Sequence, residues 1–133
     1  MPAFTLSNPD TVPTPRPGTY SNLAEIPLGD RTVLVLAGQV ALDAERNLVG
    51  GDDMRAQTDC VFAIIEAILT SRGATFADVV NIRTFLTDIG RIAEYGEVRN
   101  KYLPSTPPTS TTVEVSRLFI PGALLEVEVT AIV

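Results

Sequence analysis

The chain has 133 residues, enough for one compact domain with its own core, and 45% of them are apolar and 20% charged, as in ordinary globular proteins. Its formal net charge of −6 disfavours general binding to nucleic acids, because an acidic surface repels the phosphate backbone. The sequence has no His and only one Cys, Cys60, which excludes His-based triads, disulfide frameworks and His/Cys zinc sites. Its chemistry must therefore rest on carboxylates, hydroxyls, backbone groups, Arg and Tyr.

The first 17 residues contain five prolines, so this segment is expected to be extended rather than helical. It lacks the basic run followed by an apolar run that marks a secretory signal, and no apolar stretch of the chain has membrane-spanning length. We therefore expect a cytoplasmic protein without a membrane partner, and a single domain over residues 1–133.

Two strands are predicted next, over residues 19–26 and 31–40, joined by a turn with the sequence PLGD. The second strand is rich in Val and Leu and too short for a typical helix, which indicates a buried strand. A further turn leads to a short predicted strand at residues 47–49.

A long helix is predicted to begin after Asp52 or Asp53, either of which can cap exposed backbone N–H groups, and to stop at Gly73. Cys60 within it is interpreted as a small buried hydrophobe. Apolar residues at near-helical spacing form a stripe of Met54, Val61, Ile65 and Ile68, with Ile64 and Leu69 beside it, and we expect this side of the helix to face the core.

Residues 77–88 alternate as a strand does, which predicts one shared face for Val80, Ile82, Thr84 and Leu86. Asp88 is expected to cap a second helix that runs to about Tyr102, where prolines end it. The residues of this helix that we expect to face inward are Ile92, Tyr95 and Val98.

Two strands within residues 107–133 complete the order ββ(β)αβαββ, without an internal repeat or a linker. This order predicts an α+β fold in which two helices pack on one face of a mixed sheet.

Carboxylates interrupt the two final strands, which are otherwise rich in Val and Leu. Alternation places Glu126 and Glu128 on the face opposite Val127, and Glu114 on the face opposite Val113, so we expect an apolar face for the helices and a polar-to-mixed second face. The second face is either solvated, as is common in antiparallel sheets, or covered by another subunit that leaves some acids half-buried. Burial raises the pKa of a carboxylate toward the range in which it works as an acid or base.

Several segments in their order resemble the RidA/YjgF family over residues 18–133: AGQV (37–40), RAQTDCVFAIIEAI (55–68), VVNIRTFLTDI (79–89) and the closing VEVSRL and EVEVTAIV. The resemblance implies a chorismate-mutase-like α+β fold and a homotrimer with a central barrel and clefts between subunits. It also implies hydrolysis of 2-imino acids to 2-oxo acids and ammonia, without a metal or a cofactor.

Carried over residue by residue, the resemblance implies that Glu126 positions the attacking water. It implies that the substrate is bordered by Tyr20 and fixed around Gly38, which Gln39 follows. Ala37 stands where the family has a Ser.

The chain departs from the family at the start of the next-to-last strand, where Ser110 occupies the position of the Arg that grips the substrate carboxylate. Thr112 occupies the position of a Cys and can still offer its backbone N–H to a substrate. Arg16, in the proline-rich segment, is a possible alternative anchor. Two functions stay open: a hydrolase of imines or enamines with altered substrate choice, and a trimer that binds small molecules without catalysis. Ribonuclease activity is disfavoured by the acidic charge and the absence of His.

Overall fold

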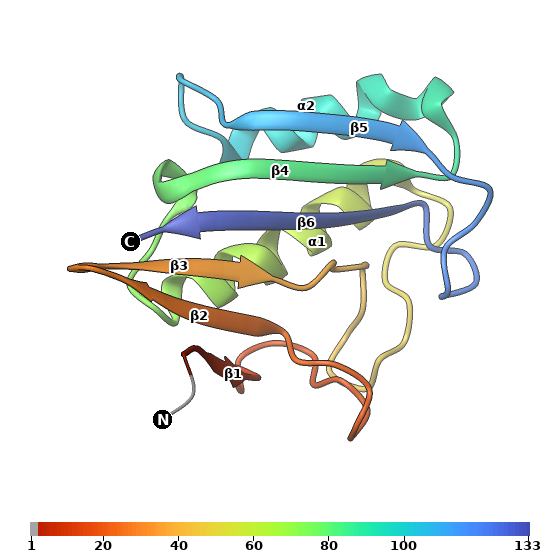
Figure 1. Cartoon of the computed structure of the whole chain (residues 1–133). Helices are drawn as coiled ribbons and strands as arrows, with labels where there is room; N and C mark the ends of the chain where they lie inside the picture. The colour runs from red at the N-terminus through yellow and green to blue at the C-terminus, as the bar shows by residue number, and fades with distance from the viewer. Residues whose placement is uncertain (1–2) are drawn as a thin grey trace.

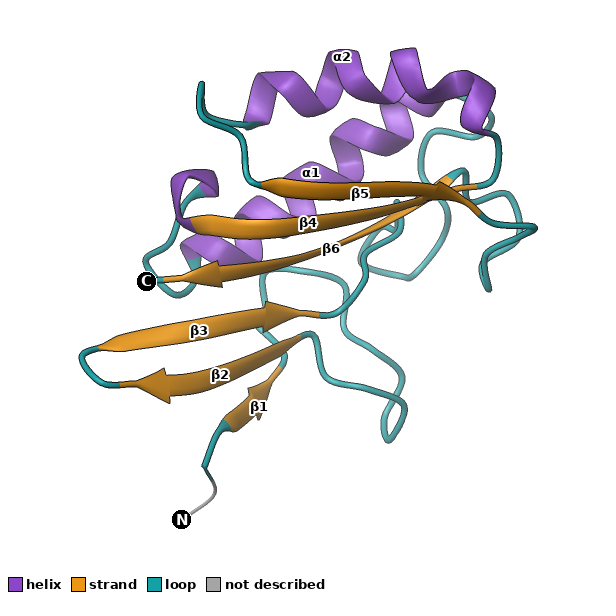
Figure 2. Cartoon of the chain, turned by 45° about the horizontal axis from the view of Figure 1, so that its top comes forward, coloured by secondary structure: helices purple, strands orange, loops and turns teal. Residues whose placement is uncertain are grey.

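The structure, a computed structural model, describes residues 3–133, and the first two residues of the predicted proline-rich segment lie outside the described residues. Within them, six strands form one mixed sheet in the order β1-β2-β3-β6-β4-β5, and the two α-helices lie on one face of it (Figures 1 and 2). This confirms the predicted α+β fold. The strands are β1 (Thr5–Ser7), β2 (Leu23–Leu28), β3 (Arg31–Leu36), β4 (Val79–Leu86), β5 (Thr109–Glu114) and β6 (Leu125–Ile132); the helices are α1 (Met54–Thr70) and α2 (Ile92–Tyr102), with short 3₁₀ helices η1 (Phe76–Asp78) and η2 (Ile89–Arg91).

Strand β6, the last in sequence, lies in the middle of the sheet between β3 and β4 and runs antiparallel to both (Figure 1). Among the strands of residues 3–133, only β4 and β5 pair in parallel, and α2 forms the crossover between them, as parallel neighbours require. Because β6 is paired along both edges, the positions of its two glutamates are set by the register, with Glu126 beside Phe85 and Glu128 beside Arg83.

Helix α1 packs as its apolar stripe predicts. Every residue of the stripe is buried, and Ile65 at its centre is fully inaccessible to solvent. Asp53 caps the helix by accepting a hydrogen bond from the N–H of Ala56 at 3.1 Å, which resolves the choice between the two aspartates. Gly73, just beyond the helix, adopts a φ of 72°, the left-handed conformation expected after a helix end.

The predicted inward face of α2 and the predicted shared face of β4 are each wrong at one terminal residue. Ile92 is 44% exposed, because it begins α2 directly after η2, while Tyr95 and Val98 are buried as predicted. Asp88 caps η2 rather than α2, since its carboxylate accepts from the N–H of Gly90. In β4 a register shift between Val79 and Asn81 turns Val79 into the core and leaves Val80 exposed.

Strand β5 carries the largest correction, because its two faces are the reverse of those expected. Val113 pairs with Phe85 and is 41% exposed on the face away from the helices. Glu114 pairs with Leu86 and points to the helix side, where its carboxylate accepts from the N–H of Ile89 at 2.9 Å. As an edge strand, β5 has little to bury on either side, so its apolar residues do not report the core face.

The face of the sheet away from the helices, here called the open face, is mixed in character. Its apolar members are Ile26, Val33, Val35, Phe85, Val113 and Ile132, and its polar members include Asn81, Arg83, Thr111, Glu126, Glu128 and Thr130. Among the described residues, no helix combines the length and the apolar character needed to cross a bilayer.

Candidate functional site

A cavity of about 700 Å³ opens where β3 ends and β6 begins. Three loops and one strand meet there, although they are far apart in sequence: residues 16–20, 37–46 and 119–121, and the start of β6. Its lining residues with chemical interest are Arg16, Tyr20, Gly38, Arg46, Phe119 and Glu126. Four of the residues singled out from the sequence, Arg16, Tyr20, Gly38 and Glu126, therefore come together around one space.

Gly38 and Glu126 are in direct contact. The chain leaves the regular ladder of β3 after Leu36, and Gln39 then exchanges two backbone hydrogen bonds with Val127, at 2.8 and 3.1 Å. This bridge sets Gly38 beside Glu126 so closely that a Cβ on Gly38 would lie 2.1 Å from Glu126 Oε1. Only glycine leaves room for the carboxylate in this position.

The electrostatic setting of Glu126 favours its protonated form. The side chain is half-buried, and this burial raises the pKa of its carboxyl above the ordinary value, with the negative charge of Glu128 adding to the effect. No side chain or backbone group among residues 3–133 pairs with its carboxylate as an ion pair or a hydrogen-bond donor. A carboxyl group that holds its proton more readily than usual therefore faces the cavity.

The neighbouring glutamate has a different environment. Glu128 lies two residues further along β6 and approaches Arg83 of β4, with 3.6 Å between Arg83 Nε and Glu128 Oε1. It lines a smaller recess of about 90 Å³ on the open face together with Asn81 and Thr130. An exposed ion pair of this kind is an ordinary cross-strand contact.

Gln39 and Asn22 hold the N-terminal segment against the end of β3. Gln39 is buried, and its side-chain amide donates to Asn22 Oδ1 and to the carbonyl of Ala37, both at 3.1 Å. The Asn22 side chain in turn donates to the carbonyl of Pro13 at 3.1 Å, and its backbone N–H donates to Asn8 Oδ1 at 2.8 Å. These bonds anchor the segment that brings Arg16 and Tyr20 to the cavity. The side chain of Gln39 thus bonds to groups within the protein, and its contact with a substrate stays a prediction.

Sequence reasoning missed Arg46. It sits in the turn closed by the bridge between Leu42 and Leu48, and its backbone φ is 65°. Asp43 stabilises this turn by accepting from the backbone N–H groups of Glu45 and Asn47. Asp43 is a residue type that stabilises turns, so the sequence could indicate the turn. Nothing in the sequence shows that this turn lines the same cavity as Glu126.

Ser110 and Thr112 lie on β5, an edge strand of the sheet that is separated from β6 by β4. They pair with Ile82 and Thr84, so their side chains point to the helix side and not to the open face that carries Glu126. Neither lines the cavity of this chain. Their predicted contact with a substrate would need a cleft completed by another subunit, and it stays a prediction.

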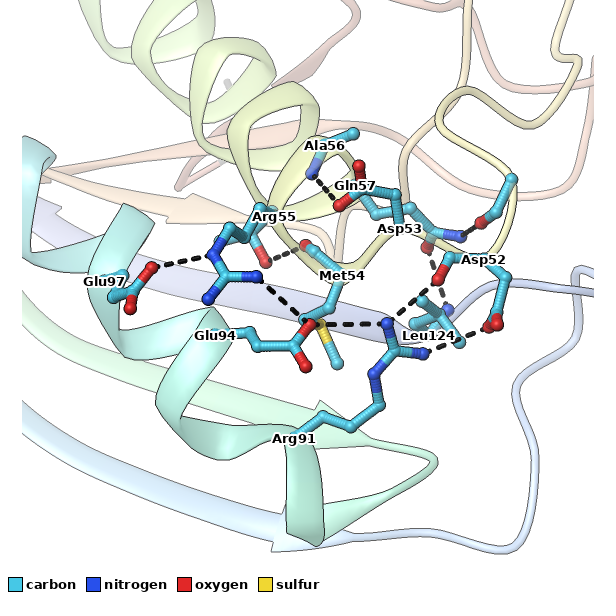
Figure 3. A network of polar contacts seen from close by, with 12 residues as sticks. Asp52, Asp53, Met54, Arg55, Ala56, Gln57, Arg91, Glu94, Glu97 and Leu124 are labelled. Atoms are coloured by element: carbon cyan, nitrogen blue, oxygen red, sulfur yellow. Dashed lines mark hydrogen bonds and ion pairs between the residues drawn. The ribbon is translucent and has the colours of Figure 1, made fainter.

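A second missed residue, Gln57, positions the far wall of the cavity. It is fully buried on α1, and its side-chain amide donates to the carbonyls of Gly51, at 2.6 Å, and Gly122, at 3.0 Å. Its side-chain oxygen accepts from the N–H of Leu124 at 2.8 Å (Figure 3). These bonds fix the loop whose residues 119–121 line the cavity.

Among the described residues, no three His, Cys, Asp or Glu side chains are grouped to hold a metal ion.

Comparison with known proteins gives a consistent result. The sequence model of the endoribonuclease L-PSP family matches residues 15–133. Protein DfrA of Myxococcus xanthus is 36% identical over 116 residues, 86% of each chain, and a RutC family protein of Saccharolobus solfataricus is 38% identical over 109 residues, 81% of this chain and 83% of that one.

Solved structures of the Rid family have the same fold. The Rid family protein YyfA of Yersinia pestis superimposes with a TM-score of 0.86 at 30% identity, covering 98% of this chain and 100% of YyfA. RidA of an Antarctic Psychrobacter superimposes with a TM-score of 0.82 at 29% identity, covering 97% and 99%.

Proposed function

The chain belongs to the endoribonuclease L-PSP family, which includes the RidA/YjgF (Rid) proteins, and on this premise we propose that it is a cofactor-free hydrolase of a small imine or enamine. The observation that carries the proposal is Glu126, a half-buried carboxyl group whose pKa is raised by burial and which faces the cavity beside Gly38. A carboxylate with a raised pKa is a stronger base than an ordinary glutamate, so it can take a proton from water and return it.

The reaction follows from that position. Glu126 accepts a proton from a water molecule while the water oxygen forms a bond to the carbon of the C=N group. The electron pair of the C=N π bond moves to the nitrogen, and the carboxyl group gives the proton it took from water to that nitrogen, which yields a carbinolamine. Glu126 then accepts the proton of the carbinolamine hydroxyl and delivers it to the nitrogen as the C=O bond forms and the C–N bond breaks, so that ammonia and a carbonyl compound leave. No electrons are gained or lost, and no cofactor is needed.

The proposal includes a homotrimer whose subunits meet over the open face. The exposed apolar side chains of this face in the single chain include Ile26, Val35, Val113 and Ile132, between 37% and 41%. Several exposed apolar side chains on one face of a sheet favour cover by a partner, and burial of this face would dry the surroundings of Glu126 further. Light scattering should give a mass near three times 14.2 kDa, and a clean monomer at micromolar concentration would contradict the assembly.

One observation favours a second candidate, a trimer that binds a small molecule without converting it. Ser110 stands where the resemblance to the family's 2-imino acid hydrolases expects Arg, so their usual carboxylate anchor is missing from β5. The family's endoribonuclease label fits this chain less well, because the net charge is −6 and there is no His to act on a phosphodiester.

The test is an imine source in the presence of the protein. An amino-acid oxidase generates 2-imino acids from a panel of amino acids, and an amine oxidase generates imines without a carboxylate; release of the carbonyl product is compared with the spontaneous rate. Glu126→Gln should lower the catalysed rate by roughly 10²- to 10⁴-fold, because the amide cannot accept a proton from water.

Glu94→Gln is the matched control, because Glu94 is a glutamate of α2 outside the cavity, and it should leave the rate unchanged. Full activity in Glu126→Gln would remove the carboxylate from the mechanism. If the natural protein accelerates hydrolysis of no imine in the panel, the binding function is the better account.

A further inference from the structure

Arg46 occupies a backbone position that is unfavourable for its residue type. Among residues 3–133 it is the only residue other than glycine with a positive φ, 65°, a region in which the Cβ crowds the backbone. Glycine would relieve this crowding. A long cationic side chain in the place best suited to glycine indicates that the side chain itself has a use.

The guanidinium of Arg46 has unused hydrogen-bonding capacity at the cavity. Its Nη1 donates to the carbonyl of Thr14 at 3.3 Å, which steadies the side chain against the N-terminal segment. No carboxylate among residues 3–133 forms an ion pair with it or with Arg16, the second cation of the cavity. Elsewhere in the described part of the chain, four arginines do pair with acids: Arg55, Arg72, Arg83 and Arg91.

We propose that Arg46, assisted by Arg16, is the anion-binding element of this cavity and holds the carboxylate of the substrate. This rests on the proposed function and names its substrate class: the imine or enamine of a carboxylic acid that also has an apolar part. A planar guanidinium with free N–H groups suits a carboxylate. Phe119, which is 64% exposed at the same cavity, offers an apolar contact for the rest of the molecule.

This assignment also accounts for Ser110. Strand β5 has no cation at that position, whereas the cavity has two on loops that come from the N-terminal half of the chain. The acid group is therefore held from the side of the Asp43–Asn47 turn, and the reacting carbon is presented to Glu126 from a different direction than an anchor on β5 would give.

The experiment measures binding of 2-oxobutanoate by titration calorimetry, with butanone as a probe of similar shape but without the carboxylate. The natural protein should bind 2-oxobutanoate saturably and butanone much more weakly. Arg46→Gly should weaken 2-oxobutanoate binding by roughly 10- to 100-fold, through loss of charge-assisted hydrogen bonds. It should fold at least as stably as the natural protein, because glycine accommodates the positive φ.

Two further variants complete the design. Arg16→Gln should weaken binding to a smaller extent. Arg31→Gln is the matched control, because it removes the same charge from the other end of β3, and it should bind 2-oxobutanoate as the natural protein does. Unchanged binding in Arg46→Gly, equal binding of butanone, or no saturable binding of 2-oxobutanoate would each overturn the assignment.

The two proposals can fail separately. A protein that binds 2-oxobutanoate through Arg46 but hydrolyses no imine contradicts the hydrolase and leaves the anion site standing. A protein that hydrolyses 2-imino acids as fast with Arg46→Gly as without it overturns the anion site alone. Glu126→Gln should keep 2-oxobutanoate binding while it loses hydrolysis.

Discussion

Two groups of carboxylates in this molecule have opposite surroundings. Between α1 and α2, arginines hold acids in a surface network: Arg55 Nε lies 2.7 Å from Glu97 Oε2, and Arg91 Nη1 lies 3.0 Å from Asp52 Oδ1 (Figure 3). At the cavity, Glu126 is half-buried and has no such partner among residues 3–133.

The pKa values of the two groups move in opposite directions for these reasons. The hydrogen bond from Arg55 lowers the pKa of Glu97, whereas burial raises the pKa of Glu126. A paired carboxylate on the surface stays ionised and joins two helices, while an unpaired one beside a cavity can exchange protons. The partner of an acid, more than its presence in a strand or a helix, therefore distinguishes a structural role from a chemical one.

The largest effect is expected from Gly38→Ala. The added Cβ would lie 2.1 Å from Glu126 Oε1, so the carboxylate must swing away from its position. Since the crowded atom ends a flexible side chain, stability should change little, while imine hydrolysis falls by roughly 10²-fold or more. Gly96→Ala in α2 is the control: its Cβ meets nothing within 4 Å, and helix propensity predicts a gain of about 0.5–1 kcal/mol with unchanged activity. An active Gly38→Ala would show that the position of Glu126 is not critical.

Ile65→Ala tests whether a loss of core packing outside the cavity leaves the activity of Glu126 intact. Ile65 is fully buried on α1, so this variant should lose roughly 2–5 kcal/mol of unfolding free energy, as large-to-small core changes do. Activity per folded molecule should be preserved. Urea denaturation measures the first quantity and a rate at low temperature the second. A loss below about 0.5 kcal/mol would mean that the assigned core face of α1 is wrong.

Ser110→Arg supplies the anchor that the resemblance to imino acid hydrolases expects on β5. We expect the natural protein, with its carboxylate anchor at Arg46, to hydrolyse 2-iminobutanoate and 2-iminopropanoate more slowly than the variant, which should gain about 10- to 100-fold from the second anchor if β5 of a neighbouring subunit reaches the cavity. Adding Glu126→Gln should abolish the gain. A variant that folds and assembles but stays inert would favour the binding function.

The smallest effect is expected in the surface network. Arg91→Gln removes contacts to Asp52 and Glu94, and exposed ion pairs contribute little, so the loss of stability should be below about 1 kcal/mol and should shrink in high salt. Imine hydrolysis should not change. A marked loss of activity would mean that the network and the cavity are coupled, and the contrast between them would fail.

Local patterns predicted the parts of the fold that local chemistry decides. The stripe on α1 and a cap at Asp52 or Asp53 follow from periodicity and capping. The faces of β5 could not be predicted in this way. An edge strand buries little, so alternation at Val113 fixes two faces without saying which of them meets the helices.

At the site, too, local sequence patterns predicted some features, while others depend on contacts between distant parts of the chain. Alternation placed Glu126 on the face away from the core, but its contact with Gly38 is set by the bridge between Gln39 and Val127, which joins residues far apart in sequence. Arg46 could not be found from the sequence, because its turn reaches the cavity only through the path of the folded chain.

The central claim is that Glu126 is a carboxyl group adapted for proton exchange. The most direct measurement is an NMR titration of the side-chain carboxyl carbons of Glu126 and Glu97 in the natural protein. The account predicts that Glu126 keeps its proton to a higher pH than the ordinary glutamate pKa of about 4.3, and that Glu97 loses its proton at a lower pH. A Glu126 pKa at or below that of Glu97 would contradict the account.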